Sequence, residues 1–138
     1  MQKLGHKKIY RIVDANFNRA KEGLRVCEDI CRFFLDAESE TKTFKALRHQ
    51  LTSVYGSWPV KKILDSRDIN GDIGRGSIAP ELSRKSFQDI FFANCQRVKE
   101  SVRVLEEFSK MDNRKTALDL KGIRYEVYNV EKKVIKKF

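Results

Sequence analysis

The sequence of 138 residues is poor in residues that break or cross-link a chain, with two prolines, seven glycines and three cysteines. The cysteines form no CxxC motif and lie beside no histidine cluster, which argues against a disulfide framework and against structural zinc. We expect Cys27, Cys31 and Cys95 to be reduced, buried small hydrophobic residues. The two histidines, His6 and His49, are not spaced as a metal-binding pair.

Long hydrophobic runs are also absent, since no segment approaches the roughly 20 apolar residues that a membrane-spanning helix needs. The basic residues 1–11 are followed by no apolar segment of the kind that secretory signals contain. These absences predict a cytoplasmic protein. The motifs of P-loop nucleotide-binding proteins, G-x-S-x-G hydrolases and HExxH metalloproteases are absent too, so those classes lack support.

Positive charge dominates the composition. Lysine and arginine number 29 against 19 aspartates and glutamates, a net charge of +10, and hydrophobic residues make up 41% of the chain. Such a composition is typical of a soluble globular protein. A positive field spread along the chain favours anionic partners such as nucleic acid, acidic lipid surfaces or phosphorylated small molecules, without choosing among them.

Apolar residues recur at intervals of three and four in four long stretches, which is the period of an amphipathic helix. The four stripes are Val13, Phe17, Ala20, Leu24, Cys27, Cys31 and Phe34; Phe44, Leu47, Leu51 and Val54; Phe91, Cys95, Val98, Val102 and Leu105; and Leu120, Ile123, Val127, Val130 and Val134. We expect the first helix to run from about Lys8 to Leu35. The stripes predict an all-α protein with these residues in its core.

Polar residues before the stripes predict where the later helices begin. The candidate caps are Asp36 or Ser39 for the second helix, Ser86 (followed by Asp89) for the third, and Asp112 or Asn113 for the fourth. Gly56 is expected to end the second helix by adopting positive φ.

The sequence contains an internal repeat. With an offset of 78 residues, segment 15–29 is identical to segment 93–107 at eight of fifteen positions. With an offset of 76, the segment Phe-Lys-Ala-Leu-Arg at 44–48 aligns with Leu-Lys-Gly-Ile-Arg at 120–124. Two nearly equal offsets in the same order indicate a duplicated helical hairpin.

We therefore predict a pseudo-symmetric four-helix bundle with a long loop between the two hairpins. A single helical domain, residues 1–138, would hold hairpin repeats at 8–55 and 86–138. The intervening residues 56–85 form a long connection for a compact domain, and this length favours a functional loop over a simple connector.

The identical positions of the repeat are largely polar, which a core stripe does not require. They are Asn16, Arg19, Lys21, Glu22, Arg25 and Glu28, with counterparts Asn94, Arg97, Lys99, Glu100, Arg103 and Glu106. They can form a solvated face held by ion pairs within each helix, such as Glu22–Arg25 and Glu100–Arg103, or they can serve function. Both interpretations remain open for the asparagines and for Arg19 and Arg97. A scaffold role is favoured for Lys21, Glu28, Lys99 and Glu106.

The loop carries a second candidate site. Residues 66–76, Ser-Arg-Asp-Ile-Asn-Gly-Asp-Ile-Gly-Arg-Gly, combine carboxylates, guanidinium groups and three glycines. Glycines allow backbone N–H groups to turn toward an anion, and Asp68 and Asp72 could hold Mg²⁺ together with phosphate oxygens. The alternative is an ordinary pair of Asn-Gly and Asp-x-Gly turns.

Four segments together resemble one small family. They are Arg11–Asp29, Thr41–His49, Ser66–Gly74 and Ala93–Phe108. In this order they are similar to the short hydroxymethylpyrimidine-phosphate kinases of thiamine biosynthesis, a domain that also occurs fused in front of the thiamine-phosphate synthase barrel. No barrel follows Phe138, so the chain resembles the stand-alone form.

The resemblance implies transfer of a phosphoryl group from ATP, with Mg²⁺, to 4-amino-5-hydroxymethyl-2-methylpyrimidine phosphate. The product would be the diphosphate that thiamine-phosphate synthase consumes, and the unphosphorylated alcohol would not be accepted. The repeated arginines are compatible with this reaction. Its nucleophile is a phosphate oxygen that is already largely ionised, so the main difficulty is to bring two polyanions together.

We hypothesise that the repeat and the loop share the chemical roles in a single hollow. Catalytic roles are expected for Arg19, Arg97, Arg67 and Asp68. Substrate or phosphate contacts are expected from Asn16, Asn94, Arg25, Arg103, Arg48 and Arg75, with the asparagines on the aminopyrimidine edge. The expected Mg²⁺ ligands are Asp68 and Asp72, with Glu22 or Glu100 in reserve.

Two other functions stay open. One is a non-catalytic accessory domain that docks on thiamine-phosphate synthase. The other is a basic nucleic-acid-binding helical protein, although the charge is dispersed and no recognition motif appears. The expected partners are ATP and the pyrimidine phosphate, with no nucleic acid or membrane, and both a homo-oligomer and a transient contact with thiamine-phosphate synthase stay open.

Overall fold

The computed structural model describes residues 3–138, with the side chains of residues 7–78 and 80–138. The elements in chain order are α1 (Lys3–Asp29), the π-helical turn η1 (Ile30–Phe34), α2 (Glu38–Tyr55), α3 (Val60–Ser66), the 3₁₀ turn η2 (Ala79–Leu82), α4 (Phe87–Ser109) and α5 (Arg114–Ile135). Every regular element within residues 3–138 is helical, which confirms the predicted all-α class.

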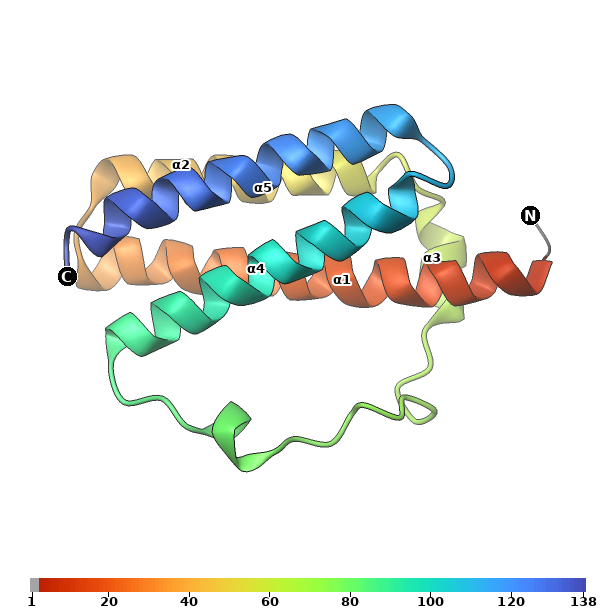
Figure 1. Cartoon of the computed structure of the whole chain (residues 1–138), viewed down its shortest axis with the longest axis horizontal. Coiled ribbons are helices and arrows are strands. Elements are labelled where there is room, and N and C mark those ends of the chain that lie inside the picture. Colours follow the sequence, from red (N-terminus) through yellow and green to blue (C-terminus); the bar gives the residue numbers. More distant parts are fainter. Residues whose placement is uncertain (1–2) are drawn as a thin grey trace.

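The four long helices pack side by side as a bundle (Figure 1). α1 packs against α2 and α4, and α5 packs against the same two helices. α3 lies against α1. Residues 67–86 then leave α3 and arch along the side of α1 and α4 that faces away from α2 and α5 (Figure 1). We call residues 67–86 the arch.

The core is built from the predicted stripes. The third and fourth stripes are buried throughout, and so are the first stripe up to Cys31 and the second up to Leu51. The fully buried side chains include three phenylalanines, Phe17, Phe44 and Phe91. None of the helices in the described part is long and apolar enough to cross a membrane.

Phe34 departs from the prediction, since its side chain is 48% exposed. The chain reaches Phe34 through η1, and the wider turn of a π-helix rotates this residue off the stripe that a regular α-helix would continue. Its ring stacks instead on Phe87, with 3.9 Å between the ring centroids.

The caps predicted for the last two helices are confirmed. The Ser86 side chain accepts a hydrogen bond from the Asp89 backbone N–H at the start of α4, with 3.1 Å between the atoms. Asn113 Oδ1 accepts one from the Thr116 N–H at 3.2 Å at the start of α5.

The prediction for the ends of α2 is partly wrong. Its N-cap is Ala37, and neither Asp36 nor Ser39 caps it with a side chain. Asp36 instead has φ 49°, a left-handed conformation that turns the chain from η1 into α2. Gly56 does end α2, but with φ −63°, so its conformational freedom is not used.

The middle segment contains α3 and η2, which the sequence analysis did not predict. α3 has only seven residues, too few for a periodic stripe to stand out. It places Ile63 in the core with no exposed surface. α3 therefore belongs to the packed body, and the irregular connection is shorter than the predicted loop of residues 56–85.

α1 and α4 approach each other closely at a small residue. A Cβ atom on Gly23 would lie 2.6 Å from Val98 Cγ2 and 3.0 Å from the backbone oxygen of Asn94, so only glycine fits without displacement. The three thiols are free and buried, as predicted, and the Sγ atoms of Cys27 and Cys95 lie 3.6 Å apart.

Candidate functional site

The repeat produces two equivalent ion pairs inside the bundle. Glu28 on α1 accepts a hydrogen bond from Arg48 Nε on α2 at 3.0 Å, and Glu106 on α4 accepts two from Arg124 on α5. The glutamate side chains are only 4% and 3% exposed. The hydrogen bond to Glu106 raises the pKa of Arg124, so this guanidinium remains charged. Both pairs hold a hairpin together, which agrees with the predicted scaffold role of the two glutamates.

Two further repeated arginines add to these pairs. Arg25 Nη1 lies 3.5 Å from Glu28, and Arg103 Nη1 lies 3.6 Å from Glu106. Each of these two arginine side chains is about half exposed, so its guanidinium lies between the buried glutamate and the solvent. Arg48, which we predicted to contact phosphate, is engaged with Glu28 and is largely buried.

The repeated asparagines brace their own helices. The Nδ2 of Asn16 donates to the Ile12 carbonyl oxygen at 2.8 Å, and the Nδ2 of Asn94 donates to the Ile90 carbonyl oxygen at 2.8 Å. Asn16 is only 4% exposed. The Asn16 Oδ1 also accepts a hydrogen bond from Arg19 Nη1 at 3.4 Å. The predicted role on the aminopyrimidine edge therefore requires a rearrangement of these bonds at Asn16, and at Asn94 it depends on the amide oxygen or on a similar rearrangement.

The outer face of α1 and α4 carries the repeated Arg19 and Arg97. Both side chains are exposed, and Arg97 Nη2 reaches across to Glu22 Oε1 on α1 at 3.8 Å. The inner sides of the two helices are filled by the core, so this exposed cross-helix pair lies on the outer side, which the arch spans (Figure 1). We call this surface the α1/α4 face.

The ion pairs that we expected within helices are not the ones that form. Within the described residues, Glu22 pairs with Arg97 rather than with Arg25. Glu100 accepts a hydrogen bond from Gln96 at 3.1 Å and does not pair with Arg103. Long side chains on adjacent helices compete with neighbours on the same helix, and a sequence pattern cannot show this competition.

Arg67 fastens the arch to α1. Its Nε and Nη2 donate to the two carboxylate oxygens of Asp14 at 2.8 and 2.7 Å, which is the bidentate geometry that arginine favours. The Asp14 side chain is 8% exposed. The same hydrogen bonds raise the pKa of Arg67. Arg67 thus holds the first residue of the arch in place beside α1.

The carboxylates of the arch form local turns. Asp68 Oδ1 accepts a hydrogen bond from the Gly71 N–H at 2.8 Å, and Asp72 Oδ1 accepts one from the Gly74 N–H at 2.9 Å. Within the described part of the chain, no three histidine, cysteine or acidic side chains gather as a metal site. Each carboxylate retains one oxygen that its own turn does not use. The turns are those of our alternative interpretation.

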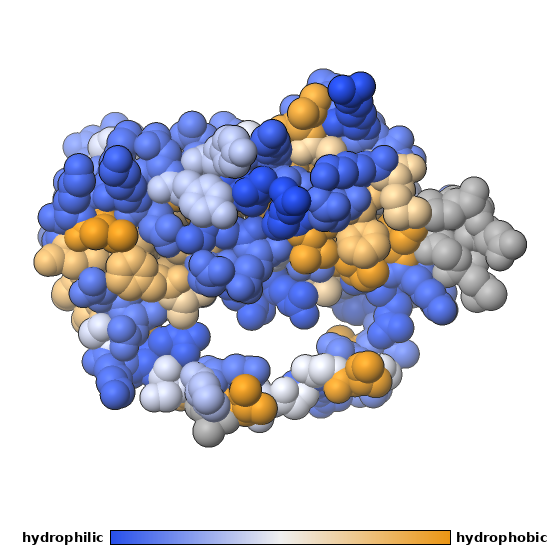
Figure 2. Space-filling model, in the orientation of Figure 1, coloured by the Kyte–Doolittle hydropathy of each residue, from blue (hydrophilic) through white to orange (hydrophobic). Residues whose placement is uncertain are grey.

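An opening separates the arch from the helices in the space-filling view (Figure 2). Four apolar residues of the arch remain exposed: Ile69, Ile73, Ile78 and Leu82. Arg75, which we predicted to contact phosphate, lies farther along the arch and donates a hydrogen bond to Asn70 Oδ1 at 3.2 Å. Exposed apolar side chains in a segment that spans an opening lack a surface to pack on.

The repeated arginines do not share one hollow, contrary to our hypothesis. Arg19 and Arg25 are six residues apart, which turns them about 120° from each other around the helix axis. Arg19 and Arg97 therefore lie on the α1/α4 face. Arg25 lines a groove between α1 and α2, and Arg103 lines a groove between α4 and α5, on the opposite side of the bundle.

The two grooves are similar in size but differ in charge. The α1/α2 groove encloses about 470 Å³ and is lined by Lys21, Glu22, Arg25, Val26, Asp29 and Arg48. The α4/α5 groove encloses about 490 Å³ and is lined by Arg103, Glu106, Lys110, Arg114, Ala117, Leu118, Lys121, Arg124 and Tyr125. Arg114, Lys121 and Tyr125 were not among the predicted site residues, although the 4-3-4 spacing of residues 114, 118, 121 and 125 places them on one side of α5.

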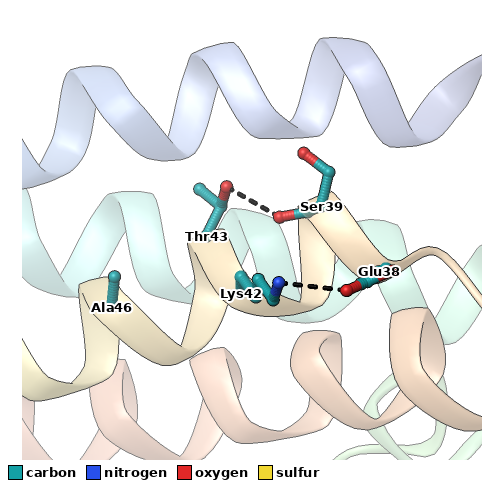
Figure 3. Close-up of a pocket in the computed structure, with 5 residues that line it drawn as sticks. All are labelled: Glu38, Ser39, Lys42, Thr43 and Ala46. Carbon is teal, nitrogen blue, oxygen red and sulfur yellow. Dashed lines mark hydrogen bonds and ion pairs between the residues drawn. The ribbon is translucent and has the colours of Figure 1, made fainter.

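A third hollow, of about 590 Å³, lies on the outer surface of α2. All five residues that line it come from this one helix (Figure 3). Its polar groups are paired within the helix, since Lys42 Nζ lies 3.0 Å from Glu38 and the Thr43 hydroxyl donates to the Ser39 carbonyl oxygen at 3.1 Å. This hollow therefore offers a ligand few free polar groups.

Comparisons with known proteins place the chain in a family. Residues 11–133 match the ThiD2 family. The chain is 40% identical over 124 residues to a thiamine-phosphate synthase of Nostoc punctiforme, covering 89% of this chain and 34% of that protein. It is 38% identical over 121 residues to a thiamine-phosphate synthase of Rhodopirellula baltica, covering 87% of this chain and 32% of that protein.

The chain spans about a third of the length of these curated relatives. No solved structure matches it at a comparable level of significance. The family match covers nearly the whole bundle, including the repeated segments and the arch. The chain belongs to the ThiD2 family, a family of thiamine biosynthesis.

Proposed function

We propose that this protein is an ATP-dependent kinase that converts 4-amino-5-hydroxymethyl-2-methylpyrimidine phosphate to its diphosphate. The observation that carries the proposal is the opening between the arch and the helices (Figure 2). Arg19 and Arg97 are exposed at equivalent positions of α1 and α4, the two helices that the arch spans. Membership of the ThiD2 family supports the substrate class.

The reaction transfers the γ-phosphoryl group of ATP to an oxygen of the substrate phosphate. The bond between the β–γ bridging oxygen and the γ-phosphorus breaks, a new oxygen–phosphorus bond forms, and ADP leaves. The nucleophile needs no strong base, because a phosphate monoester is largely ionised at neutral pH. Arg19 and Arg97 would reduce the repulsion between the two anions and hold them in line.

The arch would exclude water from the reacting phosphates. Ile69, Ile73, Ile78 and Leu82 are exposed and could pack on a bound ligand or on the α1/α4 face when the arch closes. The Asp14–Arg67 pair would act as the fixed end of this movement.

Mg²⁺ would enter as the complex with ATP. Asp68 and Asp72 each keep one carboxylate oxygen outside their turns, and Mg²⁺ commonly takes one or two carboxylates together with phosphate oxygens and water. These residues fit an ion that arrives with the triphosphate better than a resident ion, because they gather no third ligand among the described residues.

The test is to incubate the purified protein with ATP, Mg²⁺ and the pyrimidine phosphate, and to follow the diphosphate by ³¹P NMR. Arg19→Ala and Arg97→Ala should each lower turnover by about tenfold or more while far-UV circular dichroism remains unchanged. Arg32→Ala, an exposed arginine on η1 that stacks on Phe33, is the matched control and should retain full activity. Full activity in both site variants would contradict this assignment.

A second candidate is an accessory domain that docks on thiamine-phosphate synthase. The names of the relatives favour it, because the chain matches about a third of proteins that are called thiamine-phosphate synthase. If the wild-type protein forms no diphosphate but binds and accelerates a separately purified thiamine-phosphate synthase, this function replaces the kinase.

A further inference from the structure

The α4/α5 groove is the most strongly basic surface described above. Five of its nine lining residues are cations, and Glu106 is its only lining carboxylate. Glu106 is already neutralised by Arg124, with which it shares two hydrogen bonds, and by Arg103 at 3.6 Å. The groove therefore presents an excess of positive charge that its own acid does not balance.

Two of these cations, Arg114 and Lys121, are available to a ligand, whereas two others are already paired. Arg103 and Lys110 lie 3.1 and 2.7 Å from Glu107, an exposed carboxylate at the edge of the groove. Among the described residues, however, no carboxylate pairs with Arg114 or Lys121. Unpaired cations with concave surroundings of about 490 Å³ are suited to a phosphorylated small molecule.

The groove also has an aromatic wall. Tyr125 is 53% exposed, and Leu118 beside it is 59% exposed. Lys121 Nζ lies 5.5 Å and Arg124 Cζ 5.1 Å from the centre of the Tyr125 ring. A half-exposed ring flanked by cations can stack on a planar heterocycle while the cations contact its phosphates.

The equivalent groove between α1 and α2 serves as an internal reference. It is lined by Arg48 of the buried glutamate–arginine pair, but its lining also holds two carboxylates, Glu22 and Asp29, beside three cations. At the positions of Arg114, Leu118 and Tyr125, the first hairpin has Glu38, Lys42 and His49. The shared scaffold thus accounts for the ion pair and for Lys121, whose counterpart is Lys45, but it does not account for Arg114 or Tyr125.

We propose that the α4/α5 groove binds a small molecule that carries an aromatic ring and at least two phosphate groups. Arg114 and Lys121 would contact the phosphates, and Tyr125 would stack on the ring. This site lies away from the α1/α4 face and does not depend on the proposed kinase reaction.

The binding test uses isothermal titration calorimetry of the full chain with three probes, ADP, pyrophosphate and the pyrimidine diphosphate. We expect ADP or the pyrimidine diphosphate to bind at least tenfold more tightly than pyrophosphate, because only these two carry a ring. The stronger of the two identifies the source of the ligand. Absence of binding by all three at millimolar concentration, or equal binding of pyrophosphate, would overturn the proposal.

Variants locate the site. Lys121→Glu and Arg114→Glu should each weaken binding of the stronger probe by about tenfold, since each replaces an attraction by a repulsion. Lys45→Glu is the matched control, because Lys45 is the repeat counterpart of Lys121 on α2, and it should change binding less than twofold. Equal losses in Lys45→Glu and Lys121→Glu would indicate a general charge effect and would overturn the assignment.

The result is separable from the kinase test. Arg19→Ala and Arg97→Ala should leave binding in the α4/α5 groove unchanged within twofold, and backbone amide NMR shifts on adding the probe should centre on residues 103–125. Shifts centred on the α1/α4 face instead would contradict the site, whether or not the protein forms the pyrimidine diphosphate.

Discussion

The α1/α2 and α4/α5 grooves lie at equivalent places in the two repeated hairpins. They share a buried ion pair but differ in the residues that line them. Each is lined by an arginine, Arg48 or Arg124, that holds a buried glutamate on the neighbouring helix. Their linings differ, since the α1/α2 groove has two carboxylates beside three cations, whereas the α4/α5 groove has one carboxylate beside five cations and an exposed tyrosine. The shared ion pair therefore holds each hairpin together. A function specific to one groove is to be sought in the lining residues that differ.

The largest expected effect comes from breaking the common part. Glu106→Gln removes the charge that pairs with Arg124, whose side chain is only 11% exposed, and should lower the free energy of unfolding by about 3 kcal/mol. Glu28→Gln should be milder, at about 2 kcal/mol, because Arg48 is 21% exposed and its guanidinium can reach water. Urea denaturation measures both, and equal losses would show that the two pairs are more alike than their burial indicates.

Equivalent substitutions on the two sides of the contact between α1 and α4 should also change stability by different amounts. Gly23→Ala places a methyl group against Val98 and the Asn94 carbonyl, and we expect it to destabilise the protein by about 1–2 kcal/mol despite the better helix propensity of alanine. Ser101→Ala, at the repeat counterpart on α4, should change stability by less than about 1 kcal/mol, because the hydroxyl bonds only to carbonyls of its own helix. Thermal melting of both variants tests this difference, and a stabilised Gly23→Ala variant would contradict it.

The ion pair that holds the start of the arch has no counterpart in the second hairpin, because Phe92 stands where Asp14 stands in the first. Asp14→Asn should weaken the attachment of the arch, because an amide cannot accept two hydrogen bonds from Arg67 as the carboxylate does. We expect several-fold faster trypsin cleavage at Arg67 and Arg75 with a loss of stability of about 1 kcal/mol. Unchanged cleavage would show that the arch is held by other contacts.

A further prediction concerns alkaline pH. Burial, with a smaller contribution from the Glu40 carboxylate, raises the pKa of Cys31 from 9.0 to about 12. The folded protein keeps this thiol protonated where the unfolded chain ionises, so its contribution to stability is complete below pH 9 and is lost as the pH rises toward 12. Over pH 8–11, the urea midpoint should therefore fall more steeply for wild type than for Cys31→Ala. The second hairpin has Ser109 at this position, which does not titrate there.

The fold could be predicted to a large extent, because the apolar residues of its core recur in the sequence with the period of a helix. The stripes around Phe17, Phe44, Phe91 and Leu120 mark the buried side of each long helix, and the repeat pairs the helices into hairpins. The prediction failed where the period changes, as at Phe34 after the π-helical turn, or where an element is too short to show one, as in α3.

The site could be predicted only in part. The repeat singles out polar positions, but identity alone does not distinguish Glu28, which is buried beside Arg48, from Arg19, which is exposed. That distinction depends on which neighbouring helix each side chain meets. The basic side of α5 was missed because Lys121 repeats a lysine, Lys45, that drew no notice in the first hairpin. Arg114 and Tyr125 differ from their counterparts Glu38 and His49, so a search for repeated residues does not find them.

The bond between Asp14 and Arg67 has a consequence for the α1/α4 face as a whole. Two helices related by a pseudo-twofold axis form a palindromic surface, on which an elongated ligand could lie equally well in either direction. Asp14 has no acidic counterpart on α4, where Phe92 occupies the corresponding position. The arch is therefore joined to α1 by a bidentate ion pair for which the equivalent position on α4 offers no partner, so the two ends of the surface differ in charge.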